Sequence, residues 1–355
     1  MKNKSVKLIA FHLPQYHECE ENNMWWGEGF TEWTNTKKAL PIFKHHNQPR
    51  LPKNDFYYNL EEKDDFIWQL KLAKKYNVYG FCFYHYWFNG KKLLYKPLEL
   101  LKEIDSKEKI HYCFCWANET WSKTWENDNS VLIEQTYGTE NEWEEHFNYL
   151  FEFFQDEFYI KHDGSPILII YRSKMIPNFN RMVEYWNKRC IESGFSGIYI
   201  IDEYNSFQNE SICEKSIQFE PLYTMKYGRT ELEFKYYKFL SRIFNFFYKS
   251  NNLIYSYSIL WKNILKRNII CNSYMGAFVD WDNTPRKGKN GRIVLGVSTK
   301  KFKKYMKKLK NKAIRYNSEY IFINAWNEWG EGTYLEPDMK NGYGYLDVVK
   351  DVFGE

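Results

Sequence analysis

The chain has 355 residues, of which 20% are aromatic (14 Trp, 30 Tyr and 27 Phe), and part of this surplus is expected to line a site. The 50 Lys and Arg against 45 Asp and Glu leave a formal charge of +5, which is too balanced over this length to predict a nucleic-acid-binding protein. With 44% hydrophobic and 27% charged residues the chain can bury a large core, which excludes intrinsic disorder as a description of the whole.

The N-terminal residues 1–7 are mostly polar and run directly into an apolar segment, Leu8–Phe11, with no cleavage site, so the sequence predicts no secretory signal. No apolar run reaches the ~18 to 20 residues that a membrane-spanning helix requires. We therefore expect a cytoplasmic protein. Its seven cysteines lack paired spacing and are expected to be reduced, buried thiols. They are Cys19, Cys82, Cys113, Cys115, Cys190, Cys213 and Cys271.

Eight short apolar runs follow one another along the chain, and segments of helical periodicity lie between most of them. The predicted strands are 6–13, 78–83, 111–116, 167–171, 197–201, 217–219, 277–279 and 320–325. The clearest helical segments are 64–76, 142–158, 179–193 and 300–316. Because the strands are apolar along their length, both faces of a parallel sheet are expected to be covered. The eightfold alternation predicts an α/β fold, a (β/α)₈ TIM barrel in one domain over 1–355, with a doubly wound open sheet as the alternative.

Three stretches exceed the minimal barrel unit. Residues 18–58 form a long loop after the first strand, and residues 119–139 lengthen the loop after the third strand. Both are expected at the C-terminal face, where loops build the active sites of such barrels. Residues 223–270 form a basic, aromatic insertion between strands six and seven.

Nearly every predicted strand ends in aromatic or polar residues, which a barrel brings together at one rim. Aromatic faces stack on sugar rings, and planar polar groups grip hydroxyls in pairs, so this composition indicates a sugar site. Any single ring could instead serve only to cap the barrel. The candidate substrate-binding residues are His12, Gln15, Tyr16, His85, Tyr86, Trp87, Trp116, Asn118, Glu119, Trp121, Glu203, Trp281, Asp282, Asn283, Arg286, Trp326, Asn327, Trp329 and Glu336.

The segment Trp326–Gly332 carries two carboxylates three residues apart, Glu328 and Glu331. A turn at the neighbouring glycines would bring both to one side, where they could act as acid and base on a glycosidic bond. In an aromatic pocket one of them is expected to have a raised pKa. The alternative is that both cap the last helix or pair with Arg286.

His12, His17 and His85 on neighbouring strands could be interpreted as metal ligands. The surrounding carboxylates lack a recognisable ligand spacing, so hydrogen-bonded rim histidines are the favoured interpretation, and no metal is expected. The sequence also contains no phosphate-cradling Gly-rich loop and no dinucleotide fingerprint, so no cofactor is predicted.

Four spaced motifs resemble the WbsX-type proteins, which belong with the glycoside hydrolase family 99-like domains, from about residue 6 to 353. The motifs are Phe11–His17, Gly27–Trp33, Gly80–Trp87, and Trp326–Gly332 followed by Tyr334–Pro337. The resemblance implies a (β/α)₈ barrel and a role in bacterial gene clusters for surface polysaccharides such as O-antigen or capsule. Members are commonly labelled glycosyltransferases.

The hydrolases of that family are endo-acting α-mannosidases or mannanases that retain configuration through a 1,2-anhydro sugar. By motif, Glu328 matches the Glu that removes the proton of the 2-hydroxyl, and Glu331 the Glu that protonates the leaving oxygen. The N-terminal half resembles the hydrolases less than the WbsX-type proteins, which leaves the substrate open. Glu119 follows Asn118 as the acid does in many barrel glycosidases, but it lies after strand three rather than four, so we expect it to bind hydroxyls.

The sequence therefore favours an enzyme that acts on a glycosidic bond by transfer or hydrolysis, with a glycan or a lipid-linked oligosaccharide as partner and no nucleic acid. A catalytically inert glycan-binding barrel and a membrane-surface scaffold remain as alternatives. The segment 223–270 suits an anionic membrane surface, or else forms a helical cap or a subunit interface.

Overall fold

The computed structural model describes residues 5–122, 130–203, 213, 215–268 and 272–354. Parts of three predicted features therefore lie outside the described residues: Cys271, the middle of the 119–139 loop, and the last residues of the 223–270 segment.

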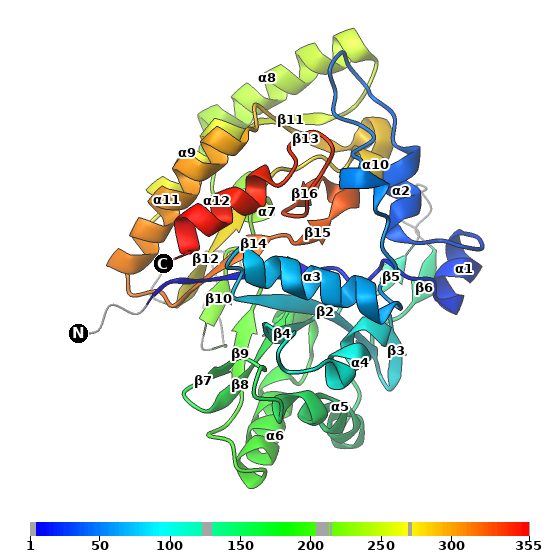
Figure 1. The fold of residues 1–355 in the computed structure, drawn as a ribbon, viewed down its shortest axis with the longest axis vertical. Helices are drawn as coiled ribbons and strands as arrows, with labels where there is room; N and C mark the ends of the chain where they lie inside the picture. The colour runs from blue at the N-terminus through cyan, green and yellow to red at the C-terminus, as the bar shows by residue number, and fades with distance from the viewer. Residues whose placement is uncertain (1–4, 123–129, 204–212, 214, 269–271, 355) are drawn as a thin grey trace.

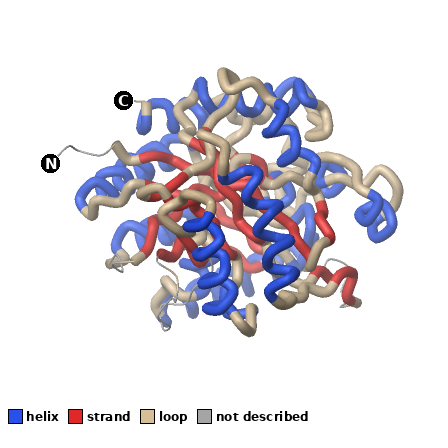
Figure 2. Tube along the Cα trace, turned by 90° about the horizontal axis from the view of Figure 1, so that it is seen from below, coloured by secondary structure: helices blue, strands red, loops and turns tan. Residues whose placement is uncertain are grey.

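Eight parallel strands form a closed barrel (Figures 1 and 2). They are β1 (Lys7–His12), β2 (Gly80–Phe88), β4 (His111–Trp116), β8 (Ser165–Ile170), β9 (Tyr199–Asp202), β10 (Lys215–Ile217), β12 (Ser273–Phe278) and β14 (Tyr320–Asn324). Each strand pairs with its neighbours in chain order, and β1 pairs with both β2 and β14. This closure confirms the (β/α)₈ barrel and excludes the open sheet.

Helices surround the barrel, and the strands are buried on both faces (Figure 2). The enclosing helices are α3 (Lys63–Lys75), α4 (Lys96–Glu103), α5 (Glu140–Phe154), α6 (Phe179–Glu192), α9 (Tyr257–Lys266), α11 (Thr299–Arg315) and α12 (Gly344–Phe353). Three consecutive residues of β8, Leu168 to Ile170, are fully buried because side chains fill the barrel inside and helices cover it outside. The four predicted helices lie within a few residues of α3, α5, α6 and α11.

The second strand is longer than the apolar run predicted. The run ends at Phe83, but β2 continues to Phe88, pairing with β4 as far as His85 and with the short antiparallel β3 (Lys91–Leu93) beyond it. Residues 84–87 are thus part of a strand, and their side chains alternate between the inside and the outside of the barrel. Strands β10 and β12 begin two to four residues earlier than predicted because polar residues, including Lys215 and Ser273, take part in the pairing.

The loops at the C-terminal ends of the strands carry most of the additional elements. These are α1 (Glu20–Trp26), α2 (Glu32–Lys38), η1 (Lys53–Asp55), β5 (Trp121–Ser122), β6 (Val131–Ile133), η2 (Ser173–Met175), α10 (Thr284–Lys287), η3 (Gly288–Asn290), β13 (Arg292–Leu295), β15 (Asn327–Glu328), η4 (Trp329–Glu331) and β16 (Thr333–Tyr334). The hairpin of β7 (Lys161–His162) with β8 lies at the other end of the barrel.

The 223–270 segment contains one helix that packs on the barrel and another that lies outside it. It includes most of α7 (Leu222–Lys226), then α8 (Glu231–Tyr248), β11 (Leu253–Ser256) and α9. Helix α9 covers the barrel, since Trp261 stacks on Phe278 of β12 at 5.5 Å. Helix α8 lies outside it, at the upper edge of Figure 1. No helix in the described part of the chain is long and apolar enough to cross a membrane.

Candidate active site

Three carboxylates meet one guanidinium at the C-terminal end of the barrel. Arg286 of α10 donates from Nη2 to Glu328 Oε2 at 3.0 Å, from Nη1 to Glu331 Oε1 at 2.9 Å, and from Nε to Glu32 Oε1 at 2.9 Å. Glu328 and Glu331 follow β14, Arg286 follows β12, and Glu32 begins α2 after β1. The structure therefore brings both predicted catalytic carboxylates to one point, and the predicted pairing with Arg286 is present as well.

Two glycines shape the turn that carries this pair. A Cβ on Gly330 would lie 1.7 Å from Glu32 Oε1, so only glycine lets this carboxylate approach. Gly332 has φ +65°, and a Cβ at this position would collide with the backbone of Asp282. Together they let the chain turn between Glu328 and the strand β16, and this places both carboxylates on one side.

Burial and crowding of charge set the electrostatics of the pair. Burial raises the pKa of Glu328 and of Glu331, and the neighbouring carboxylates raise it further, while Arg286 acts in the opposite direction. One guanidinium cannot balance three carboxylates, so the site favours retention of a proton at neutral pH. The Glu328 side chain is 8% exposed and that of Glu331 is 24% exposed, so Glu331 is the more accessible of the two.

Two tyrosines of β2 lie within electrostatic reach of Glu328, and Glu203 lies near one of them. Burial raises the pKa of Tyr84 and Tyr86, and the charge of Glu328 contributes to both shifts. Glu203, after β9, accepts a hydrogen bond from Cys115 Sγ at 2.8 Å, and burial raises its pKa to about 8. The structure thus places the predicted site residue Tyr86 near Glu328, while the predicted site residue Glu203 acts on Tyr84 of the same strand.

A buried network of hydrogen bonds around Glu336 holds the turn that carries Glu328 and Glu331. Trp329 Nε1 donates to Glu336 Oε2 at 2.7 Å, Tyr58 donates to the same oxygen at 2.9 Å, and Gln69 Nε2 donates to Glu336 Oε1 at 2.8 Å. Burial raises the pKa of Glu336 to about 8, against the effect of these donors. Gln69 Oε1 in turn accepts from His12 Nε2 at 2.8 Å, and burial lowers the pKa of His12 to about 3.

Asn327 ties the turn to the first strand. Its side chain accepts from Leu13 N at 2.8 Å and donates to Leu13 O at 2.9 Å. The Tyr16 hydroxyl donates to the Asn327 carbonyl. Gln15 and Trp326 are buried beside this connection: the Gln15 carbonyl accepts from Glu32 N at 3.0 Å, and Trp326 packs on Phe81 at 4.9 Å.

The segment after β12 positions Arg286. Asp282 accepts from His46 Nε2 and Gln48 Nε2 at 2.8 Å each and from Thr284 Oγ1 at 2.7 Å. The pKa of Asp282 is lowered to about 2 because these donors and Arg50 outweigh burial. Asn283 accepts from Arg292 N at 2.7 Å, and Trp281 is almost fully buried. These predicted residues thus bind other groups of the protein and hold the segment that carries Arg286.

His85, Trp87 and Trp116 lie outside the barrel wall, around His146 of α5. His85 Nε2 lies 2.9 Å from His146 Nε2, and Trp87 stacks on the His146 ring at 4.6 Å. Trp116 meets the same ring edge-on at 4.8 Å and donates to the Trp87 carbonyl. The structure does not bring these three side chains to Glu328.

The histidines considered as metal ligands have separate partners. His17 Nδ1 bonds to Pro14 O at 2.9 Å, while His12 and His85 bond to Gln69 and His146. Among the described residues no group of three His, Cys, Asp or Glu side chains is arranged to hold a metal ion.

The loop after β4 carries one fixed and two accessible candidates. Asn118 binds the backbone of Arg172 through both ends of its amide, at 2.8 and 2.9 Å. Glu119 is partly exposed and pairs with the Arg172 side chain. Trp121 meets Tyr86 edge-on at 5.0 Å. Glu119 and Trp121 therefore remain partly exposed at the rim.

Sequence reasoning missed Glu32. It is fully buried and held by Arg286, yet the candidate residues did not include it, although it lies in the Gly27–Trp33 motif. The sequence did contain a signal for Glu32: it is a carboxylate with apolar and aromatic neighbours at the start of a helix.

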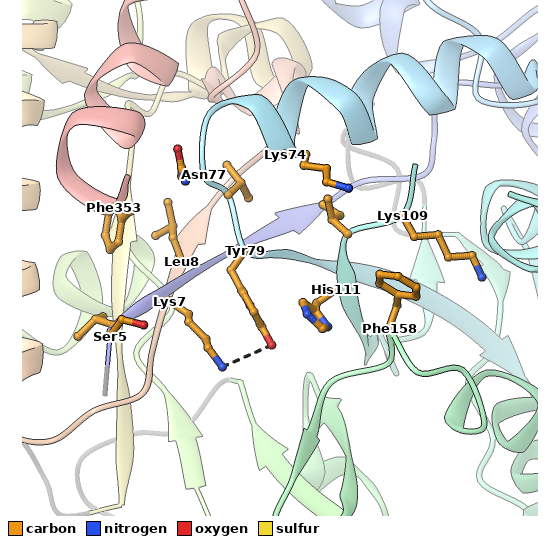
Figure 3. Close-up of a pocket in the computed structure, with 13 residues that line it drawn as sticks. Ser5, Lys7, Leu8, Lys74, Asn77, Tyr79, Lys109, His111, Phe158 and Phe353 are labelled. Carbon is orange, nitrogen blue, oxygen red and sulfur yellow. Dashed lines mark hydrogen bonds between the residues drawn. The ribbon is translucent and has the colours of Figure 1, made fainter. Parts of the chain in front are cut away.

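A separate cavity of about 380 Å³ lies at the opposite end of the barrel (Figure 3). It surrounds the start of β1 and β2, where Lys7 Nζ lies 3.5 Å from the Tyr79 hydroxyl and Tyr79 stacks on His111. In barrels of this kind the N-terminal face serves stability rather than chemistry.

Comparisons with known proteins agree with this architecture. The protein WxcX from Xanthomonas campestris pv. campestris strain B100 and its counterpart from a second strain are each 31% identical over 351 residues, which is 97% of this chain and 49% of the relative. The chain thus spans about half the length of these relatives.

Two solved structures share the fold. A glycoside hydrolase-like protein superposes with a TM-score of 0.59 at 13% identity, covering 99% of this chain and 95% of that one. The GH99 endo-alpha-mannosidase from Bacteroides thetaiotaomicron gives a TM-score of 0.56 at 13% identity, covering 98% and 96%. The family described as "Glycosyltransferase WbsX" matches residues 8–349, so this chain belongs to the WbsX glycosyltransferase family.

Proposed function

We propose that this chain is a carbohydrate-active enzyme that acts on a mannoside-like glycosidic bond, with retention, by transfer or hydrolysis, during assembly of a bacterial surface polysaccharide. The observation that carries the proposal is the pair Glu328 and Glu331, bound to adjacent nitrogens of Arg286 at the C-terminal end of a barrel. Family membership and the shared fold support a glycan as substrate. The reaction would take place in the cytoplasm, where the buried thiols Cys82, Cys113 and Cys115 stay reduced.

In the first step Glu328 removes the proton of the sugar 2-hydroxyl, and the resulting oxygen attacks C1. The bond between C1 and the leaving oxygen breaks, and Glu331 gives its proton to that oxygen. A 1,2-anhydro sugar and a free alcohol result. In the second step Glu331 takes a proton from water or an acceptor hydroxyl, whose oxygen attacks C1, the bond between C1 and O2 breaks, and Glu328 returns its proton to O2. Two inversions at C1 give retention.

This division of roles requires that Glu331 carries the proton that the site retains and that Glu328 is ionised, as its contact with Arg286 favours; the exposure of the two carboxylates supports it. Glu331 is the more accessible of the two. Its proposed role requires this, because it must contact first the leaving alcohol and then the incoming one. Glu328 is less exposed, pairs with Arg286 and lies within electrostatic reach of Tyr84 and Tyr86, and we propose that a ring hydroxyl reaches it there.

The substrate is proposed to be a glycan or a lipid-linked oligosaccharide. Tyr86 and Trp121 would provide stacking surfaces, while Glu119 and Glu203 would accept from hydroxyls. We assign the other candidates a positioning role, because His12, Asn327, Glu336, Asp282 and Asn283 bind groups of the protein itself.

The test compares Glu328→Gln with Glu331→Gln on an α-mannoside. Each substitution should lower turnover by ~10² to 10⁴ and leave sugar binding detectable. With an activated leaving group that needs no proton, the first step of Glu331→Gln should be largely restored and that of Glu328→Gln should not. Near-normal turnover of Glu328→Gln would refute the assignment, and equal rescue of both would reverse the roles.

A glycan-binding barrel without catalysis is the second candidate. The observation in its favour is that Arg286 occupies an oxygen of both carboxylates. Wild-type protein that binds mannosides but turns over neither hydrolytic nor transfer substrates would establish this function instead.

A further inference from the structure

Helix α8 carries a row of large apolar side chains that faces solvent. Their spacing of four and three residues places them on one face of the helix. Phe239 is 61% exposed and Phe246 is 81% exposed. On the opposite face Tyr237 and Ser241 are buried against the protein. The members of this apolar row are Leu232, Tyr236, Phe239, Ile243 and Phe246.

A basic row runs along one side of the apolar row. It consists of Lys235, Lys238, Arg242 and Lys249, all exposed. No carboxylate among the described residues forms an ion pair with any of the four. Apolar and basic rows side by side are the arrangement of helices that lie in the plane of an anionic membrane surface.

Beyond the basic row lies a cavity of about 360 Å³ between α7, α8 and β11. Its wall carries four cationic side chains, Lys226, Arg229, Lys238 and Arg292, and among the described residues that line it there is no carboxylate. The remaining wall is mainly apolar and aromatic. Such a cavity can take a phosphate group together with the first carbons attached to it.

We propose that the apolar row, the basic row and this cavity form one docking surface for an anionic phospholipid bilayer. The aromatic side chains would enter the headgroup region, the basic row would lie against lipid phosphates, and the cavity would hold one phosphate headgroup. The charge of the surface selects this occupant over a second copy of the chain. An antiparallel twofold pairing of two α8 helices through the apolar row would set the two cationic rows against each other.

The docking surface is connected to the active-site rim. Phe43, from the loop between α2 and η1, contacts Phe244 and Tyr248 at the end of α8, with ring centroids 5.3 and 5.8 Å apart. Phe43 also stacks on His46 at 4.3 Å, and His46 holds Asp282, two residues before the helix that carries Arg286. A bilayer against α8 would therefore lie beside the loops that surround Glu328 (Figure 1).

Vesicle co-sedimentation tests the proposal without requiring turnover, so it stands or falls separately from the proposed function. The full chain should bind phosphatidylcholine vesicles that contain phosphatidylglycerol, not pure phosphatidylcholine, and high salt should weaken binding. Lys235→Glu with Lys238→Glu should weaken binding at least about thirtyfold, since each charge near the surface is worth roughly fivefold. Lys304→Glu with Lys308→Glu changes the net charge equally on the exposed side of α11 and should leave binding unchanged.

Two further variants separate docking from simple adsorption. Phe239→Ser with Phe246→Ser should weaken vesicle binding by roughly tenfold or more for each ring. Arg229→Gln with Arg292→Gln should also weaken vesicle binding, because both side chains line the cavity and neither belongs to the basic row. Thermal unfolding identifies any variant that fails to fold.

Three outcomes overturn the proposal. Absence of vesicle binding at low salt would mean that the apolar row of α8 binds a protein partner and not a bilayer. Binding that depends on the lysines but not on Phe239 and Phe246 would be adsorption by charge only. A wild-type dimer that Phe239→Ser with Phe246→Ser converts to monomer would show that a second copy covers the apolar row.

Discussion

Arg286 influences how the two carboxylates of the proposed catalytic pair, Glu328 and Glu331, hold protons. Its contacts with Glu328 and Glu331 reach the loop after β14 and its contact with Glu32 reaches the loop after β1, and it lowers the pKa of Glu328 against the effect of burial. A lysine could not replace it, because three directed contacts require the planar guanidinium.

We predict that Arg286→Gln moves the acid limb of the kcat/KM profile to higher pH. Without the guanidinium the pKa of Glu328 rises further, so the base becomes ionised only at higher pH, by about 1 to 3 pH units. Measurement of kcat/KM against pH provides the check. Arg315→Gln, at the exposed end of α11, is the matched control. An acid limb that stays in place would show that Arg286 does not control the base.

Glu203 should make stability depend on pH. Its pKa is raised from 4.5 to about 8, so the folded state holds a proton that the unfolded chain has already lost in this range. The stabilisation is complete below pH 4.5 and decreases by about 1.4 kcal/mol per pH unit until the pH reaches about 8.

Glu203→Gln should therefore match the wild type in acid and become the more stable protein as the pH rises. The free energy of unfolding, measured by denaturant titration across this range, tests the prediction. The exposed Glu184→Gln should show no such divergence. Parallel curves for wild type and Glu203→Gln would mean that Glu203 is ionised in the fold.

The second strand shows how an element sorts its side chains. The run Tyr84–Trp87 looked like a cluster of site residues, but β2 continues through it, and alternation places Tyr84 and Tyr86 inside and His85 and Trp87 outside. The alternation could be predicted once the strand was known to continue. The apolar run gave no sign of this, because the pairing with β4 and β3 extends the strand.

Helix α8 begins at a capping box that can be tested by itself. Glu233 N donates to Thr230 Oγ1 at 3.2 Å, and Thr230 N donates to Glu233 Oε2 at 2.9 Å. Thr230→Ala should lower the free energy of unfolding by about 1 kcal/mol, and Thr230→Ser, which keeps the hydroxyl, should change it little. Denaturant melts of both variants measure this, and equal losses would show that the hydroxyl is not the source of the effect.

At the scale of the molecule, closure of the barrel gathers the chemistry at one end. Glu32, Arg286 and Glu328 come from the loops after the first, seventh and eighth strands, and the first of these loops lies beside the other two only because β1 pairs with β14. An open sheet would leave Glu32 far from the other two.

Turnover is expected to survive exhaustive treatment with EDTA, because the proposed mechanism assigns every proton transfer to a carboxylate. Activity assays before and after chelation provide the measurement. Loss of activity that a divalent ion restores would contradict the carboxylate mechanism and favour a nucleotide-sugar transferase.

The sequence by itself determined the barrel, the order of its elements and the two catalytic candidates. Apolar periodicity reports burial, and the Trp326–Gly332 motif is local, so neither needs the tertiary structure. Only the tertiary structure decided which rim residues meet. Arg286 and Glu32 are 254 positions apart, and their contact depends on closure of the sheet and on the close approach that Gly330 allows. Burial, which no local pattern measures, then sets the pKa values on which the proposed chemistry depends.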